Sequence, residues 1–226
     1  MNVVKEHFET EAKAFDEIIM KLIPFYDQMV EALVSAIPYD RKAFIDVIDL
    51  GCGTGTIARK VVERFPNATI TCIDLAENMI EMAKDKLSFH MNSRFMIKDF
   101  NYYQFDQKYQ VVVSSLALHH LLTDDDKKIF YQKIYNSLEK GGAFYNADVI
   151  LASNEKLQKA YIDKWVAFMG QTVSMNEIEN NWLEKYRAED HPARMMDQLY
   201  WLSKIGFRDV DVIWKYYNFA VYGGIK

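Results

Sequence analysis

An apolar run that leads into three closely spaced glycines constrains the fold of this chain more than any other feature. Residues 46–50 have the composition of a buried strand, glycines follow at Gly51, Gly53 and Gly55, and residues 56–65 carry apolar side chains at helical spacing. A buried strand, a glycine-rich turn and a helix in succession are typical of a nucleotide-binding cradle. Glycine is needed there because the backbone takes positive φ and approaches the ligand closely. The helix that follows presents unpaired N–H groups to the bound molecule.

The spacing of the glycines narrows the choice of ligand. A dinucleotide fingerprint that starts at Gly51 would need glycine at position 56, where the chain has Thr56. Started at Gly53, the fingerprint survives in a relaxed form through Gly55 and Ala58, so a nicotinamide or flavin ligand stays open.

Composition limits the class of protein. With 226 residues, half of them hydrophobic, the chain is long enough for one domain with a substantial core. A net charge of −5 argues against a broad nucleic-acid surface, and no apolar run is long enough for a membrane span. Cys52 and Cys72 lie in apolar strand patterns without metal-ligand spacing, and the charged N-terminus is unlike a signal peptide. We therefore expect a cytoplasmic protein with reduced thiols.

Acidic residues end the next two predicted strands. Asp74 closes the run 68–74, 19 residues beyond Gly55, where a carboxylate reaches the ribose hydroxyls of a nucleotide-type ligand. The alternative is that Asp74 only caps the helix predicted over 77–87. Asp99 ends the strand 93–99 and is placed to accept a hydrogen bond from an adenine amino group. The alternative for Asp99 is a simple turn residue.

The remaining elements continue the alternation. A strand over 108–115 leads to His119 and His120, and a helix capped by Thr123 runs to Gly141-Gly142, with Asp124 to Asp126 as capping residues and not a metal cluster. The fifth strand follows over 142–151, and five alternations predict a doubly wound parallel sheet. Residues 191–204 then form a helix, and 210–217 and 218–225 form a hairpin.

Two regions have helical patterns without motifs. Residues 5–36 form a helix interrupted at Pro24, which either folds over the ligand as a lid or merely covers an edge of the sheet. Residues 153–187 form two helical segments rich in Met and aromatic residues, which either pack as core or roof the substrate site.

Taken together, these motifs resemble class I S-adenosylmethionine (SAM) methyltransferases. The resemblance rests on D-L-G-C-G-T-G, Asp74 and Asp99-Phe100, and it extends from Tyr26 to the C-terminus. It implies an α/β, Rossmann-like, doubly wound seven-stranded sheet in the order 3-2-1-4-5-7-6. It also implies one domain, divided into a helical lid (1–44), a core (45–152), a helical insertion after strand 5 (153–190), and a last helix with a terminal hairpin (191–226). The SAM-binding residues that it implies are Asp49, Gly51, Cys52, Gly53, Gly55, Asp74, Leu75, Met79, Asp99, Phe100, Ser115 and Leu116.

Within that superfamily the chain is most similar to the carboxy-SAM synthases and related tRNA wobble-uridine enzymes. Shared features include Pro24-x-Tyr26, Lys204-x-Gly206-Phe207 and Asn218-Phe219. Two departures favour ordinary SAM: the glycine motif lacks that group's serine, and Trp201 replaces an arginine, so it cannot pair with a carboxylate. The expected activity is therefore methyl transfer to a small-molecule acceptor. Carboxy-SAM synthesis, a tRNA-modifying role and SAM binding without catalysis remain alternatives.

The chemistry expected of such a site is mainly orientation, since the sulfonium of SAM carries the reactivity. His120 or His119 is the candidate general base, and Tyr26 is expected to close over the sulfonium. The sequence shows no metal-ligand spacing, so no metal is expected. tRNA as a partner is not supported by the charge, no membrane partner is expected, and a homodimer is implied by resemblance only.

Overall fold

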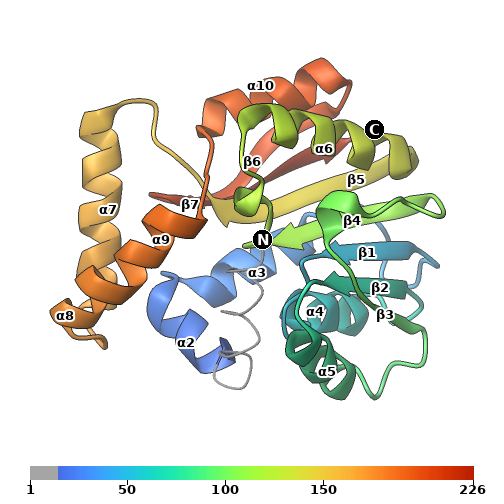
Figure 1. Ribbon diagram of the computed structural model, residues 1–226. Coiled ribbons are helices and arrows are strands. Elements are labelled where there is room, and N and C mark those ends of the chain that lie inside the picture. The colour runs from blue at the N-terminus through green and yellow to red at the C-terminus, as the bar shows by residue number, and fades with distance from the viewer. Residues whose placement is uncertain (1–14) are drawn as a thin grey trace.

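A seven-stranded sheet forms the centre of the molecule (Figure 1). The computed structural model describes residues 15–226 of the chain. The sheet order is β3-β2-β1-β4-β5-β7-β6, which confirms the predicted fold class. The strands are β1 (Asp46–Leu50), β2 (Thr69–Asp74), β3 (Ser93–Ile97), β4 (Tyr109–Ser115), β5 (Leu138–Val149), β6 (Arg208–Tyr216) and β7 (Phe219–Ile225). The first five are parallel, and β7 runs antiparallel to both β5 and β6.

Helices cover both faces of this sheet. They are α2 (Phe15–Leu22), α3 (Tyr26–Ser35), α4 (Thr56–Arg64), α5 (Glu77–Lys86), α6 (Asp124–Ser137), α7 (Glu155–Met169), α8 (Met175–Glu177), α9 (Leu183–Glu189) and α10 (Met195–Ile205). A π-helical turn, Ile178–Trp182, joins α8 to α9. Buried side chains of α3, α4 and α5 pack on one face of the sheet, and those of α6 and α10 pack on the other.

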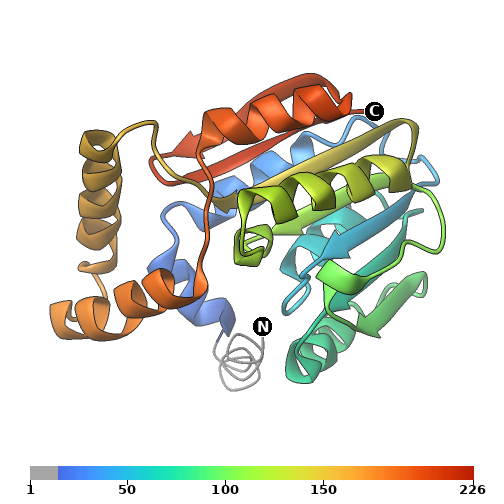
Figure 2. The same cartoon turned by 45° about the horizontal axis from the view of Figure 1, so that its top comes forward.

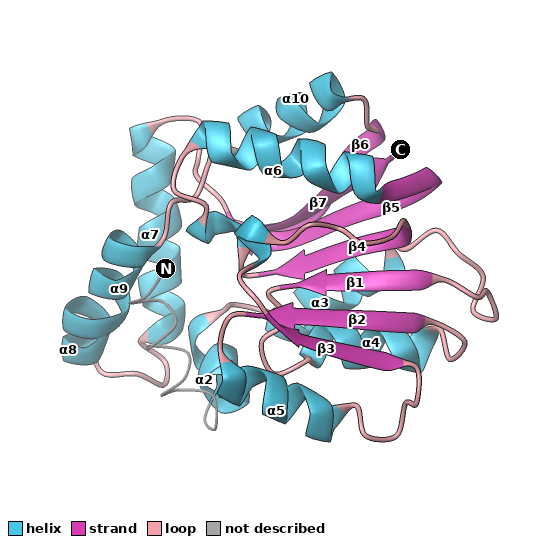
Figure 3. Cartoon of the chain, turned by 45° about the vertical axis from the view of Figure 1, so that its right-hand side comes forward, coloured by secondary structure: helices cyan, strands magenta, loops and turns pink. Residues whose placement is uncertain are grey.

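The carboxyl ends of the parallel strands point toward one group of helices (Figure 3). Alternate residues of β1 divide between the two cores: Val47 belongs to one, and Ile48 and Leu50 belong to the other. The strands are therefore buried on both faces, as an α/β sheet requires. In the rotated view of Figure 2, α7 and α9 stand apart from the sheet, beside α2.

The N-terminal helical prediction is confirmed over the part that can be compared. The helix breaks between α2 and α3, where Pro24 precedes Phe25, a residue with φ of 54°. Residues 1–14, including the predicted face residue Phe8, lie outside the described part of the chain.

The predicted boundary between α6 and β5 was wrong. The helix stops at Ser137, and β5 begins at Leu138, so Gly141-Gly142 lies inside the strand and does not end the helix. The pairing of β4 with β5 shifts between Tyr109 and Val111, next to these glycines. A Cβ on Gly142 would stand 3.0 Å from the carbonyl oxygens of Gln110 and Glu139. Glycine therefore allows the close backbone approach at this irregular point of the sheet. The predicted N-cap of α6 at Thr123 is confirmed, and Thr123 and Asp126 form a reciprocal capping box.

Within residues 15–226, no helix has both the length and the apolar character needed to cross a membrane.

Candidate active site

A cleft lies at the carboxyl ends of β1, β2 and β4, where the sequence predicted the cofactor. Including its open mouth, the cleft has a volume of about 780 Å³. Most of the predicted cofactor residues line it, namely Gly51, Cys52, Gly53, Asp74, Leu75, Met79, Phe100, Ser115 and Leu116, together with Tyr26 and His120. Side chains that are 64 residues apart in sequence, Cys52 and Leu116, therefore share one wall.

Asp74 ties the glycine loop to the end of β2. Its carboxylate accepts hydrogen bonds from the backbone N–H of Gly53 at 2.8 Å and from that of Ala76 at 2.9 Å. Since α5 has Ala76 as its N-cap, Asp74 closes the turn ahead of the helix and is not its N-cap. A carboxylate offers about four acceptor positions, so these bonds leave the predicted ribose role compatible with the geometry.

The three glycines of the loop have different physical roles. All three have positive φ, at 71° for Gly51, 52° for Gly53 and 82° for Gly55. A Cβ on Gly51 would overlap Ala117, and one on Gly55 would press on Ala83 of α5 at 3.0 Å. A Cβ on Gly53 would meet nothing nearer than Phe15, at 4.0 Å. Gly51 and Gly55 therefore permit close packing, whereas Gly53 keeps the cleft itself open for a ligand.

Asp49 lies beneath the loop and not in the cleft. Its side chain is fully buried, and neither carboxylate oxygen has a hydrogen-bond partner among residues 15–226. Burial raises its pKa to about 8, the nearby charge of Asp74 adds to the rise, and the backbone amide of Ala58 offsets part of it. A positively charged group bound in the cleft would stabilise the ionised form of this buried acid, so Asp49 fits a cofactor that carries positive charge.

Two further predicted residues lie outside the wall of the cleft. Gly55 is the N-cap of α4, packed against α5, and Asp99 is the N-cap of a 3-10 turn, Phe100–Tyr102. The Asp99 carboxylate accepts from the N–H of Asn101 at 2.9 Å, which is the turn role that the sequence left open. Its neighbour Phe100 does reach the cleft.

Helix α2 is held over the mouth of the cleft by a polar cluster. Asp16 accepts from the Thr54 hydroxyl at 2.6 Å, and the Lys86 ammonium lies 2.7 Å from the other oxygen of Asp16. Lys86 also donates to the Thr54 hydroxyl at 2.9 Å. Partial burial opposes ionisation, but the hydrogen bonds from Lys86 and Thr54 outweigh it and lower the pKa of Asp16. Phe15, on the same helix, lines the cleft, so α2 lies where a lid was predicted, and closure over the ligand stays a prediction.

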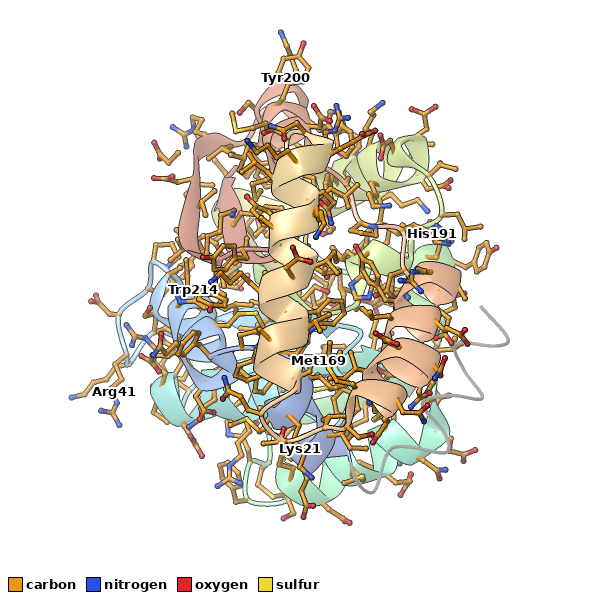
Figure 4. All side chains as sticks on the ribbon, turned by 90° about the vertical axis from the view of Figure 1, so that its left-hand side faces the viewer. Lys21, Arg41, Met169, His191, Tyr200 and Trp214 are labelled. Carbon is orange, nitrogen blue, oxygen red and sulfur yellow. The ribbon has the colours of Figure 1, made fainter. Side chains whose placement is uncertain are left out.

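A second cavity of about 790 Å³ adjoins the first. Much of its apolar wall comes from α2, α7, the π-helical turn and α9, with Ile19, Trp165, Trp182 and Tyr186 among its residues. Figure 4 looks onto this side: α7 crosses the front with Met169 at its lower end, and α9 lies beside it, ending near His191. The Trp165 indole N–H donates to the carbonyl of Leu22 at 2.7 Å, which joins the insertion to the lid. The insertion therefore packs against α2 and forms part of the wall of this cavity.

Phe15, Leu116 and His120 line both spaces, so the cleft and the cavity meet there. Leu116 has φ of 50°, a left-handed conformation that is costly for a residue with a branched side chain. Strain of this kind costs about 1–3 kcal/mol and is concentrated at functional sites. The backbone at the junction is thus fixed in a shape that the leucine itself does not favour.

The two predicted histidines occupy different environments. His119 Nδ1 donates to Asp148 at 2.5 Å, and its Nε2 lies 3.4 Å from Asp190. Burial alone would lower the pKa of His119, but the charges of Asp190 and Asp148 raise it to about 10. Burial and the charge of His119 lower the pKa of His120 to about 4. His120 is therefore neutral at pH 7, whereas His119 is protonated and is not placed to act as a base.

Asp148 belongs to a buried polar network that crosses the end of the sheet. Asn146 donates to the other oxygen of Asp148 at 3.1 Å and to the Tyr222 hydroxyl at 2.9 Å. Tyr222 in turn donates to Gln198 of α10. These bonds fix the carboxylate that orients His119.

Tyr26 lines the cleft, and its place over the sulfonium stays a prediction. Burial and the charges of Asp16 and Asp49 raise the pKa of its hydroxyl, which stays protonated at neutral pH. Trp201, where the resemblance had implied an arginine, is on α10 beneath the Lys128 ammonium, 5.2 Å from the ring centre, and lines neither space.

Several residues of the site were missed by the sequence interpretation. Thr54, Thr56, Ile57, Ala76 and Ala117 line the cleft beside predicted neighbours, and a wider window around each motif would have found them. Asp148 and Asp190 carried no signal, because only the tertiary structure brings them to His119.

The fold and the cleft together define a class I SAM-dependent methyltransferase architecture. A family profile described as a methyltransferase domain matches residues 47–142. The carboxy-S-adenosyl-L-methionine synthase of Nautilia profundicola is 26% identical over 225 residues, which is 98% of this chain and 94% of that protein. Malonyl-[acyl-carrier protein] O-methyltransferase 2 of Ilyobacter polytropus is 25% identical over 215 residues, 90% of this chain and 79% of that protein.

Solved structures show the same fold. Human N-acetylserotonin methyltransferase in complex with SAM superposes with a TM-score of 0.64 at 16% sequence identity. The match covers 98% of this chain but spans only 56% of that protein. The domain match, the relatives and the shared fold together support a class I SAM methyltransferase, similar to the carboxy-SAM synthases, with SAM as its cofactor.

Proposed function

We propose that this protein transfers the methyl group of SAM to a small-molecule acceptor held in the second cavity. The observation that carries this proposal is the junction at Phe15, Leu116 and His120, where the cofactor cleft opens into an apolar cavity. Methyl transfer needs the two reactants in line and shielded from water. Adjacent pockets with a shared wall would align the two reactants. Helix α2, which Asp16 ties to the glycine loop, would shield them from water.

The residues of the cleft fit SAM, although their individual roles are proposals. Bound SAM supplies an activated methyl group on a positively charged sulfonium. Asp74 is proposed to hold the ribose, Leu75 and Phe100 the adenine, and the Tyr26 ring to face the sulfonium. Gly53 leaves the space that the cofactor needs.

The acceptor is proposed to be an apolar molecule of modest size, methylated in the cytoplasm, where Cys52 and Cys72 stay reduced. Aliphatic and aromatic side chains make up most of the cavity wall, which suits a hydrophobic body. His120 is proposed to hydrogen-bond the nucleophilic atom of the acceptor, because it is the polar side chain that lines both spaces. Holding the nucleophile in line accounts for roughly 7–11 kcal/mol of barrier lowering in such reactions.

Carboxy-SAM synthesis is the second candidate, because similarity to that enzyme extends over 98% of the chain. The cleft argues against it: among the described residues that line it there is no Lys or Arg to pair with an added carboxylate.

Mass spectrometry of ligand released from the purified protein tests both candidates. Methyl transfer predicts SAM or S-adenosylhomocysteine, and carboxy-SAM synthesis predicts a species heavier by a carboxyl group. Conversion of SAM to S-adenosylhomocysteine, measured against a panel of hydrophobic acceptors, then separates an enzyme from a SAM-binding protein without turnover. Recovery of the carboxylated species would overturn the first proposal.

A further inference from the structure

The second cavity contains three side chains with metal-ligating atoms at close range. His119, His120 and Asp190 each offer one such atom, and these atoms lie within 4.8 Å of one another. The sequence predicted no metal ligands, because Asp190 is 70 residues from His120 and belongs to the loop after α9. We name these three side chains the His119–His120–Asp190 cluster.

Two separations in this cluster are close to the edge lengths of a tetrahedral coordination site. His119 Nε2 and His120 Nδ1 lie 3.4 and 3.6 Å from the same Asp190 oxygen. Four ligands placed about 2.0–2.1 Å from a zinc ion have edges of about 3.3 Å. The carbonyl oxygen of Glu189 accepts a hydrogen bond from His120 Nδ1 at 3.2 Å, so a cation bound at this nitrogen would take the place of that proton.

The groups behind the cluster are those that metal-ligating histidines normally have. A ligating imidazole usually gives its other ring N–H to a carboxylate, which fixes the tautomer and the ring orientation. His119 does so through Nδ1 to Asp148, at 2.5 Å. Asp148 is itself held by Asn146, so the orientation of Nε2 toward Asp190 is determined by a buried network.

The cluster also has an open side. All three of its residues line the second cavity, and His120 reaches the cofactor cleft as well. Sites with three protein ligands and one position open to a pocket are those in which a metal binds substrate, whereas structural sites are closed by four. Two imidazoles with one carboxylate select zinc or a related first-row divalent ion over magnesium or calcium.

We propose that the His119–His120–Asp190 cluster binds one zinc-type divalent cation at the wall of the acceptor cavity, and that the cation displaces to water the proton carried by His119 Nε2 in the metal-free protein. Cation binding by this cluster does not depend on the proposed methyl transfer. The part that the cation takes in the reaction rests on that proposed function. In that role the ion binds an oxygen of the acceptor next to the cofactor cleft and lowers the pKa of a bound hydroxyl, whose proton passes to water. This would make an oxygen-containing acceptor the preferred class.

Cobalt(II) is the probe, because its visible absorption reports a site of mixed nitrogen and oxygen ligands. Tag-free protein, stripped with a chelator, should bind about one Co²⁺ per chain and develop this absorption, and Zn²⁺ should displace it. Zn²⁺ should also raise the melting temperature, by an amount that grows with the logarithm of the free Zn²⁺ concentration above its dissociation constant. An absence of both responses in the wild-type protein overturns the proposal.

Variants assign the ligands. Asp190→Asn and His119→Gln should abolish the cobalt spectrum. His90→Gln should keep it, because His90 contacts the carbonyl of Ala68 at the amino end of β2, away from the cleft. Asp148→Asn should weaken Co²⁺ affinity about 10–100-fold, the effect expected for a group behind a ligand. Circular dichroism confirms folding of each variant, and a cobalt spectrum retained by folded Asp190→Asn overturns the assignment.

The cobalt-binding experiment and the methyl-transfer assay can fail independently of each other. A cobalt spectrum that Asp190→Asn removes supports the site even if no acceptor is methylated. A lack of cobalt binding overturns it even if SAM is turned over.

Discussion

The cofactor cleft and the second cavity touch at His120, yet the chain builds them in opposite ways. The cleft is made of short motifs at strand ends, and its key bonds join the glycine loop to the end of the neighbouring strand, as in Gly53 to Asp74. The cavity is made of segments far apart in sequence: Trp165 of the insertion donates to Leu22 of the lid, 143 residues away. The cofactor cleft is therefore determined by local sequence motifs, whereas the second cavity is determined by packing between distant segments. Substitutions in the cleft should therefore change SAM affinity, and those at the junction should change turnover.

The largest effect should come from Gly53→Val. Its branched side chain would occupy the cleft from a residue with φ of 52°, so SAM binding should be abolished while the domain stays folded. Isothermal titration calorimetry measures the affinity, and circular dichroism measures the fold.

Gly141→Val is the matched control, because Gly141 also has positive φ, at 82°, but lies in β5 with nothing within 4 Å of an added Cβ. It should lose stability through the same backbone strain and keep its SAM affinity. Retained binding by Gly53→Val would show that the cofactor lies elsewhere.

His120→Ala should slow turnover roughly 100-fold and leave SAM affinity nearly unchanged, because His120 lies at the junction and the cofactor is held by the loop. Initial rates and calorimetry on one preparation measure the two quantities. His90→Ala, which removes an imidazole bonded to the carbonyl of Ala68, should change neither. A loss confined to SAM affinity would make His120 a cofactor ligand.

Asp74→Ala should weaken SAM binding by about 1–3 kcal/mol, because it leaves ribose hydroxyls and the N–H of Gly53 without their acceptor. Asp99→Ala should weaken it less, since the Asp99 carboxylate accepts from Asn101 and lies outside the cleft wall. Calorimetric titrations of the two variants with SAM show which substitution costs more affinity. An equal loss in both would restore the adenine role predicted for Asp99.

Asp49→Asn tests the acid beneath the cleft. The pKa of Asp49 rises from 3.8 in the unfolded chain to about 8 in the fold, so between these values the folded state holds a proton that the unfolded state has lost. SAM-free wild-type protein should therefore lose stability as pH rises from 4 to 8, by at most about 1.4 kcal/mol per pH unit from this group. The variant should lose less over the same range in urea unfolding. Equal slopes would mean that Asp49 does not change protonation on folding.

The sequence by itself determined the sheet, its order through the resemblance, and most of the cleft. Glycine spacing, apolar strands and the acid at position 74 are local signals, because the loop geometry requires particular residue types at fixed offsets. The end of α6 escaped prediction because Gly141-Gly142 suits a helix stop and a strand irregularity equally well.

Only the tertiary structure decided which surface the insertion covers, which histidine is charged, and what lies beside it. A row of aromatic residues fits a core as well as a cavity wall, and the pKa of an imidazole depends on carboxylates that the sequence places 29 and 71 residues away from His119. Such contacts leave no periodic trace in the chain, because packing between distant segments, and not local backbone geometry, brings them together.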